Sequence, residues 1–170
     1  FLLTPLPILF AICLNEISST RYRKFVQTVT TLPHFVSWVI LYSFVFAMVS
    51  NDGVVNQLGA KYDWWTTPIK PLQNLKIVYP FQIGLLKWKS LGWDSIIYIA
   101  AIAGIDQEQY EAAYIDGAGR FRTAISITLP NLLPTFVVLL LLNISNIVNT
   151  GYEQYFVFKN SIVYDRIEVL

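Results

Sequence analysis

Two long apolar runs constrain the fold of this chain more than any other feature. The run 132–148, LLPTFVVLLLLNISNIV, carries no charged residue, and neither does the run 35–49, FVSWVILYSFVFAMV. A helix needs about 20 mostly apolar residues to cross the hydrocarbon core of a bilayer. The second run reaches that length if Leu32 and His34 join it, with Pro33 in the first helical turn. Each run therefore predicts a membrane-spanning helix.

Two further apolar segments extend this interpretation. Phe1 to Leu14 is too short to cross a membrane alone. Ile77 to Ile105 is long enough but is interrupted by KWKSLGWD, whose charged residues would lie at membrane depth. We therefore expect an all-α, polytopic transmembrane bundle with about four spans. The chain opens without an initiator Met and without the basic region of a signal peptide, so we expect it to be a fragment of a longer protein.

Composition supports a membrane protein and argues against several other classes. The 170 residues are 55% hydrophobic and only 14% charged, and the mean hydropathy is +0.50, which is unusual for a soluble domain of this size. The formal net charge of +1 gives no argument for a nucleic-acid partner. The sequence contains neither a nucleophile–base–orienter pattern nor a phosphate-binding glycine-rich loop, so any ATPase activity is expected on another chain, and no cofactor or metal is expected on this one.

A polar stretch, YEAAYIDGAGRFRTAISITLP, separates the last two apolar segments. Asp106 precedes it as a candidate N-cap, and Gln109 stands at the N3 position of a capping box. A short helix is therefore predicted from about Gln107 to Ile115. Gly117 breaks this helix because glycine accepts the left-handed conformation at low cost. After Gly119 the chain can restart as a helix that enters the membrane.

The short helix has two interpretations. Ala112 and Ala113 are small enough for another protein to approach the backbone closely, and Glu111 adds one charge beside them. In that case the stretch is a docking surface outside the bilayer. Alternatively it is an interfacial loop whose polar residues simply meet water. Spacing alone favours the second interpretation.

A family resemblance favours the first. The polar stretch closely resembles the EAA motif, E-A-A followed by D-G-A and later by I-x-L-P, of permease subunits in binding-protein-dependent ABC importers. The stretches LNEISSTRYRKFVQTVTTLPHFVSWVI and WKSLGWDSIIYIAAIAGIDQEQYEAA are also similar to sugar permeases, and the likeness looks closest to the carbohydrate branch, including permeases for polysaccharides and complex saccharides. The matching motif residues are Glu111, Ala112, Ala113, Asp116, Gly117, Ala118, Ile127, Leu129 and Pro130.

The resemblance implies a single permease domain over residues 1–170, lacking the first and last of the six helices usual in the family. It also implies that the loop 106–131 is cytoplasmic and that its short helix docks in a cleft of an ATP-hydrolysing subunit. Glu111 would pair with a basic residue of that subunit. The small residues of the motif, Ala112, Ala113, Gly117 and Ala118, would permit close docking, and Asp116 with Gly117 would hold the turn.

Further partners follow from the same resemblance. They are a dimer of the ATPase, which would bind ATP and Mg²⁺, a second permease subunit, and an extracellular solute-binding protein. The implied location is the plasma membrane of a prokaryote. Counting Lys and Arg does not give the orientation, because five lie on each side of the expected spans.

Polar residues inside the spans indicate a candidate substrate path. Asn143, Asn146 and Asn149 recur every three residues and so form one stripe on an apolar helix. Their amides suit sugar hydroxyl groups, but hydrogen bonding between helices is an almost equally good explanation. Trp93 is a candidate for stacking on a sugar ring, and the resemblance places this stretch at the translocation site.

Three charged residues near Trp93 also allow two interpretations. Lys87, Lys89 and Asp94 could line a cavity that selects an acidic saccharide such as a uronide. Alternatively the span begins near Leu91, and the lysines extend toward the outer interface. The second is slightly favoured. Relatives tend to have an apolar residue in place of Lys87, so its role stays open.

The leading functional hypothesis is a permease subunit of an ABC importer for a sugar or oligosaccharide. An ABC permease for a non-sugar solute is the main alternative. A membrane-embedded enzyme would need acids or histidines clustered at one interface, which the expected spans do not provide. A structural membrane scaffold would not account for both the asparagine stripe and the EAA pattern.

Overall fold

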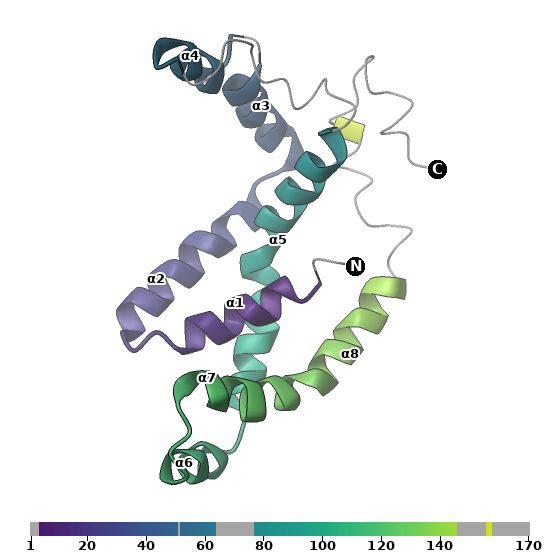
Figure 1. Ribbon diagram of the computed structural model, residues 1–170. Helices are drawn as coiled ribbons and strands as arrows, with labels where there is room; N and C mark the ends of the chain where they lie inside the picture. The colour runs from purple at the N-terminus through teal and green to yellow at the C-terminus, as the bar shows by residue number, and fades with distance from the viewer. Residues whose placement is uncertain (1–3, 51, 64–76, 146–155, 158–170) are drawn as a thin grey trace. The chain divides into compact units, whose positions relative to one another are not determined.

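The structure, a computed structural model, describes residues 4–50, 52–63, 77–145 and 156–157. Every element in these residues is helical (Figure 1). The chain divides into two compact units, which are described separately. The first comprises Phe1–His34 and Trp88–Val148, and the second comprises Phe35–Lys87 and Asn149–Leu170.

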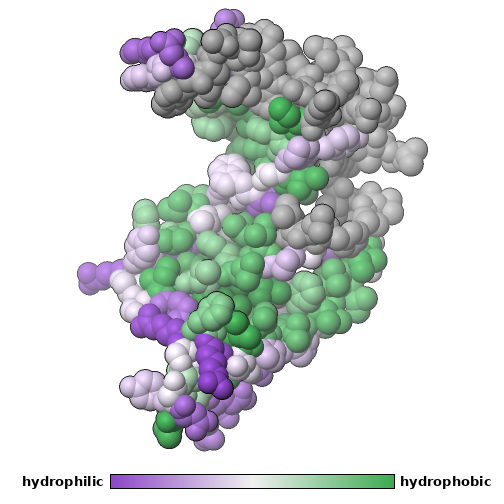
Figure 2. Space-filling view, in the orientation of Figure 1, coloured by the Kyte–Doolittle hydropathy of each residue, from purple (hydrophilic) through white to green (hydrophobic). Residues whose placement is uncertain are grey.

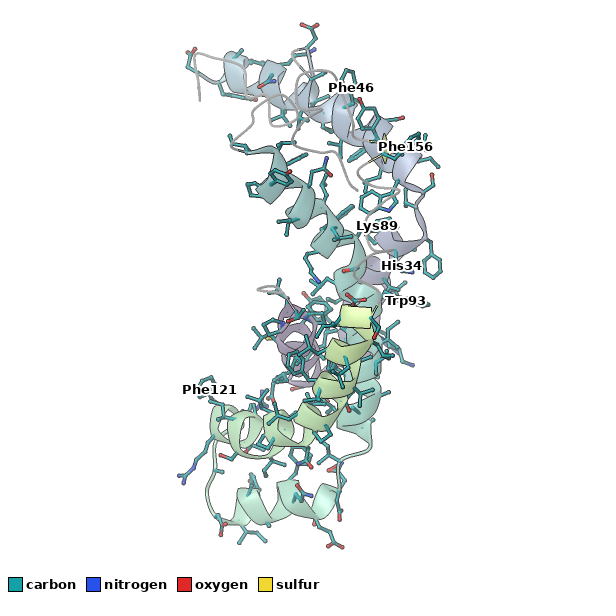
Figure 3. All side chains as sticks on the ribbon, turned by 90° about the vertical axis from the view of Figure 1, so that its right-hand side faces the viewer. His34, Phe46, Lys89, Trp93, Phe121 and Phe156 are labelled. Atoms are coloured by element: carbon teal, nitrogen blue, oxygen red, sulfur yellow. The ribbon has the colours of Figure 1, made fainter. Side chains whose placement is uncertain are left out.

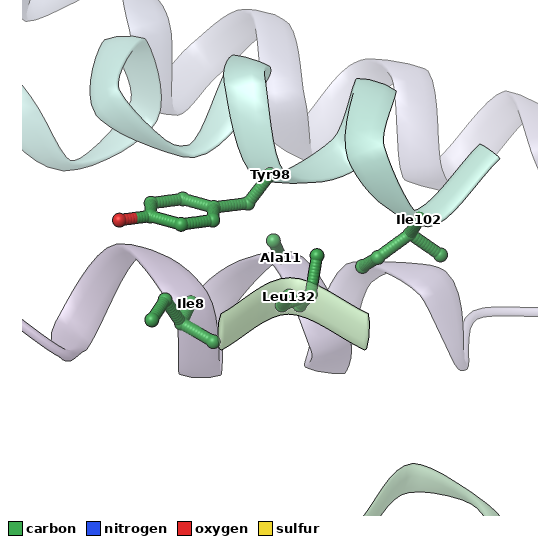
Figure 4. Packing of buried hydrophobic residues seen from close by; sticks show 5 residues of the cluster. All are labelled: Ile8, Ala11, Tyr98, Ile102 and Leu132. Atoms are coloured by element: carbon green, nitrogen blue, oxygen red, sulfur yellow. The ribbon is translucent and has the colours of Figure 1, made fainter. Parts of the chain in front are cut away.

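The first unit is built around one apolar cluster contributed by three helices. The cluster joins α1 (Leu6–Asn15), the C-terminal part of α5 (Val78–Ala103) and α8 (Leu129–Ser145). Ala11 and Leu132 are completely buried in it, and their side chains meet between the helices (Figure 4). The remaining members are Ile8, Tyr98 and Ile102. Residues more than a hundred positions apart in sequence therefore share one core.

A close helix crossing joins α2 (Thr20–Thr31) to α5 in the same unit. A Cβ atom placed on Gly92 would lie 2.3 Å from the carbonyl carbon and oxygen of Thr30 and 2.6 Å from the amide nitrogen of Thr31. Any side chain at this position would overlap the backbone of α2, so only glycine fits. Small residues allow such approaches between membrane helices, and the buried Ser95 beside the crossing donates a hydrogen bond to the Gly92 carbonyl at 2.8 Å.

Helix α2 lies between the first apolar segment and the apolar run 35–49. It begins after Ser19, whose hydroxyl accepts a hydrogen bond from the Tyr22 amide at 3.4 Å, the usual role of an N-cap serine. Leu32–Phe35 then form a short 3₁₀ turn, η1. The expectation that the next helix begins at Leu32 is wrong. Helix α3 begins at Trp38, because Ser37 is extended and caps it by accepting from the Ile40 amide at 3.4 Å.

The second unit contains α3 (Trp38–Val49), α4 (Val54–Lys61), the N-terminal part of α5 and a helical turn at Phe156–Val157. Its apolar cluster is centred on the buried residues Leu41 and Val45 of α3, with Phe81 and Leu85 of α5 packed against them. Helix α4 follows α3 after residues 50–53.

Two stretches in the described residues are long and apolar enough to cross a membrane. They are Trp38–Lys61, of 24 residues, which takes in α3 and α4 and includes the undescribed residue 51, and Arg120–Ser145, of 26 residues. Each overlaps most of an apolar run from which the sequence predicted a span. Helix α1 has only 10 residues, and α5 carries Lys87, Lys89 and Asp94, so these two spans stay predictions.

The second of these stretches is continuous from α7 (Arg120–Thr123) through the π-helical turn η2 (Ala124–Thr128) to α8. In η2 the Leu129 amide donates to the Ala124 carbonyl, five residues back. The turn precedes Pro130, and Pro134 lies inside α8. Because proline cannot donate an amide hydrogen and crowds the carbonyl four residues earlier, regular α-helical geometry is interrupted here.

Candidate functional site

The EAA stretch forms a short helix whose bounds match the sequence prediction. Helix α6 runs Gln107–Ile115, and Asp106 Oδ1 accepts a hydrogen bond from the Glu108 amide at 3.0 Å. The predicted N-cap is therefore confirmed. The Gln109 side chain does not follow the capping-box pattern: its Oε1 atom accepts a hydrogen bond from Asn131 Nδ2 at 3.1 Å.

The C-terminus of α6 is closed by a Schellman motif. The Ala118 amide donates to the Ala113 carbonyl at 2.9 Å, and the Gly117 amide donates to the Tyr114 carbonyl at 3.0 Å. Gly117 has φ = +72°, a conformation that costs an L-residue energy but not glycine. Gly119 is extended and precedes α7. The predicted helix, turn and restart are all present.

The outward side of α6 combines one charge with large apolar groups. Glu111, Tyr114 and Ile115 share a helical face because they are spaced by three and four residues. Tyr114 is 83% exposed and Ile115 is 84% exposed. In the part of the chain that the structure describes, Glu111 forms no ion pair. In Figure 2 the region of α6 is largely hydrophilic, in contrast to the apolar helices of the same unit.

The alanines of the motif lie on the other side of α6. Ala112 and Ala113 border a hollow of about 320 Å³ between α6 and the segment α7–η2, and Ala118 lies at the same hollow. The motif alanines and Glu111 therefore occupy different faces of one helix. The other lining residues are Gln109, Asp116, Arg122, Thr123, Ser126 and Ile127.

A second group of residues surrounds Trp93, one of the predicted substrate-path residues. The His34 ring stacks on the Trp93 ring with centroids 4.4 Å apart and an interplanar angle of 3°. Lys89, one turn earlier on α5, donates from Nζ to the His34 carbonyl at 2.9 Å. Figure 3 shows the three side chains in one region of the unit. Sequence reasoning did not find His34, because no local pattern links it to residues 55 or more positions away.

The remaining predicted substrate-path residues are placed only in part. Asp94 and Lys87 are half-buried on α5. Asn143 is exposed, and its Nδ2 donates to the Leu139 carbonyl of its own helix at 2.8 Å. Asn146 and Asn149 lie outside the described residues. The asparagine stripe thus stays a prediction. No group of His, Cys, Asp and Glu within the described ranges could hold a metal ion.

Comparison with known proteins decides the family. The binding-protein-dependent transport system inner membrane component family matches residues 4–168. The chain belongs to this family. The fold is therefore that of the helical permease bundle, and the family consists of membrane transport components and not of enzymes.

The curated relatives of this chain include a permease that is named for saccharide transport. The chain is 39% identical to the protein LplB of Bacillus subtilis strain 168, covering 93% of this chain and 49% of LplB. It is 40% identical to the polygalacturonan/rhamnogalacturonan transport system permease protein YteP of the same strain, covering 92% of this chain and 49% of YteP. The chain thus spans about half the length of these relatives.

A solved structure has the same fold. It is the crystal structure of a bacterial ABC transporter involved in the import of the acidic polysaccharide alginate. The TM-score is 0.90 at 37% sequence identity, and the match covers 97% of this chain and 57% of that chain. A second structure of a bacterial alginate ABC transporter, in complex with an alginate pentasaccharide-bound periplasmic protein, gives a TM-score of 0.91 at 37% identity.

Proposed function

We propose that the full-length protein is a permease subunit of an ABC importer that moves a saccharide across the plasma membrane of a prokaryote. The observation that carries this proposal is the form of the EAA stretch: a helix capped at both ends and without a buried residue, whose exposed Glu111 forms no ion pair with any residue that the structure describes. A helix that packs so little within its own unit is suited to contact a different subunit. Family membership supports this role for it.

The proposed partner at α6 is a cytoplasmic ATPase subunit. Glu111 forms an ion pair with a basic residue there, and Tyr114 and Ile115 supply the apolar contact, as aromatic and aliphatic anchors do in protein interfaces. Asp116 and Gly117 hold the turn that follows, while the small residues Ala112, Ala113 and Ala118 keep the other side of the helix open. ATP and Mg²⁺ bind on the ATPase dimer. A second permease subunit and an extracellular solute-binding protein complete the importer.

The saccharide is acidic. This inference rests on the names of two similar proteins, one a polygalacturonan/rhamnogalacturonan permease and one an importer of the acidic polysaccharide alginate. Trp93, which is 44% exposed and held in place by the His34 stack, offers an aromatic surface for a sugar ring. Lys89 supplies positive charge beside it. The ammonium group has three donors, so its bond to the His34 carbonyl is compatible with a second acceptor. Asp94, Asn143, Asn146 and Asn149 are the proposed polar lining of the substrate path.

Charge reversal at the docking helix tests the coupling. In the full-length protein assembled with its ATPase, we expect Glu111→Arg to reduce uptake by about tenfold or more, because it places like charges together at a close contact. Asp52→Arg is the matched control, since it reverses an exposed acid outside the EAA loop. Normal uptake by Glu111→Arg would sink the coupling assignment.

Substrate class is tested with two labelled probes of equal length. One is an oligogalacturonate and the other is a neutral malto-oligosaccharide. We expect uptake and stimulation of ATP hydrolysis only with the acidic probe. Uptake of the neutral probe alone would contradict an acidic substrate while leaving the permease assignment intact.

A further inference from the structure

Among the residues that the structure describes, two side-chain hydrogen bonds attach α6 to the rest of its unit. The Tyr110 hydroxyl shares one with Thr128 Oγ1 at 3.0 Å, and Gln109 Oε1 accepts the other from Asn131 Nδ2 at 3.1 Å. Gln109 and Tyr110 are adjacent on α6. Thr128 and Asn131 are three residues apart on the continuous segment η2–α8. Because α6 buries no residue, these bonds carry an unusually large share of its attachment.

Each bond has one feature that favours its geometry. Thr128 is only 3% exposed, so its bond to Tyr110 is shielded from competing water, and an unpaired hydroxyl at this position would be costly. The Asn131 amide also donates to the Ile127 carbonyl at 2.8 Å. Two carbonyl-type acceptors therefore orient that amide, so that it points its nitrogen toward Gln109.

The attachment falls on the interrupted part of the spanning helix. Thr128 is the last residue of the π-helical turn η2, and Asn131 directly follows Pro130. Neither Pro130 nor Pro134 can donate an amide hydrogen to the carbonyl four residues earlier. Helices bend most readily at prolines and π-helical turns. Movement of α6 would therefore act on the part of the segment η2–α8 that bends most easily.

We propose that Gln109, Tyr110, Thr128 and Asn131 form a brace that transmits movement of α6 to α8 during transport. The brace rests on the proposed function, because it presupposes that an ATPase moves α6. Its members are positioning residues: they fix α6 on the spanning helix and do not touch the ATPase or the saccharide. Loss of the brace lets α6 move without α8, so ATP is hydrolysed with less transport.

The test measures the saccharide transported per ATP hydrolysed by the complete importer reconstituted in vesicles, with an oligogalacturonate as probe. Tyr110→Phe removes one hydroxyl and Gln109→Met removes one acceptor. We expect each to lower the ratio by about fivefold, the factor that one net hydrogen bond typically contributes to an equilibrium. The double variant is expected to lower it further.

Matched variants separate transmission from folding. Tyr22→Phe makes the same change on the exposed side of α2 and should leave the ratio unchanged. Gln109→Glu keeps an oxygen for Asn131 and should retain most of the coupling, unlike Gln109→Met. Thr128→Ser keeps the hydroxyl and should do the same, unlike Thr128→Val. The ATPase should co-purify with every variant.

Two results would overturn the brace. One is an unchanged ratio in the double variant. The other is loss of the ATPase from that variant, because the contacts would then maintain docking and not transmission. A wild-type importer that shows neither uptake nor stimulated hydrolysis with any saccharide probe would instead refute the proposed function, so the two failures are distinguishable.

Discussion

The α2–α5 crossing and the end of α6 both depend on a glycine, but for different physical reasons. Gly92 is required by space, since a Cβ atom there would overlap the backbone of Thr30. Gly117 has open space around its Cβ position, but its φ of +72° is a backbone conformation that other residues adopt only with strain. A positive φ belongs to a local motif that sequence can reveal. A helix crossing depends on a residue 62 positions away, which no local pattern indicates.

This difference predicts which region tolerates change. The crossing and the core around Leu132 depend on many atoms in fixed positions, so substitutions there should destabilise the whole unit. The α6 region is exposed and is held by caps and a few hydrogen bonds. Substitutions there should have small effects on stability and larger effects on coupling.

Gly92→Ala should have the largest effect on stability. The new methyl group would lie 2.3 Å from backbone atoms of Thr30, and separating the helices should cost about 3 kcal/mol, the upper part of the range for overpacking. The measurement is the thermal unfolding midpoint of the purified protein in detergent.

Gly84→Ala is the matched control for that prediction. It lies in the same helix, and nothing lies within 4 Å of its Cβ position. The added methyl group should be neutral or slightly stabilising, since alanine is the better helix former. Equal midpoints for the two variants would show that the crossing is not close.

Leu132→Ala should come next. The side chain is completely buried in the core of the first unit, so truncation leaves a cavity. Lipid is as apolar as leucine, so lost packing contributes more than lost hydrophobic transfer, and we expect about 2 kcal/mol, at the low end of the range for this change. Leu133→Ala, at a 51% exposed position on the same helix, should have a much smaller effect on the unfolding midpoint.

Gly117→Ala should cost about 1 kcal/mol, because alanine is strained at a positive φ. We expect the unfolding midpoint to change little, because α6 contributes few packing contacts, but hydrogen exchange of the α6 amides should accelerate. Gly119→Ala, at an extended residue with open space around its Cβ position, is the control and should leave that exchange unchanged. Identical exchange rates in both variants would argue against the Schellman turn.

The smallest effect is expected at the ion pair between Glu16 and Arg120. Their charged atoms are 3.9 Å apart, and the two side chains are 40% and 76% exposed. Exposed pairs of this kind contribute little, so Glu16→Gln should change stability by less than about 0.5 kcal/mol. A larger shift in the unfolding midpoint would mean that a few exposed contacts anchor the EAA region more firmly than its lack of burial implies.

The sequence predicted the α6 region in detail because its determinants are local. Asp106, Gly117 and Gly119 lie within a few residues of the backbone groups that they satisfy or redirect, so the bounds of α6 could be read directly. The apolar runs likewise predicted the two stretches that can cross a membrane. Family membership, which the motif suggested, is confirmed by the match over residues 4–168.

The determinants that sequence did not indicate act at long range. The stack of His34 on Trp93 joins residues 59 positions apart, and the Tyr110–Thr128 bond joins residues 18 apart. Neither follows from helical periodicity. The start of α3 was also misplaced, because Pro33 and Ser37 offer competing start signals and only Ser37 caps the helix. The roles of Trp93, Lys89 and the asparagines are still predictions.

The π-helical turn η2 also sets the rotational phase of everything that follows it. A π-helical turn accommodates about one residue more than an α-helical turn, and one residue corresponds to about 100° of rotation about the axis. If η2 became α-helical, Leu132 would turn away from Ala11, and a different side of α8 would face the core. The turn therefore sets which side of α8 faces the core: deletion of one residue between 124 and 128 should make it an α-helical turn with Leu132 still in the core, whereas insertion of one further residue should rotate α8 by about 100°.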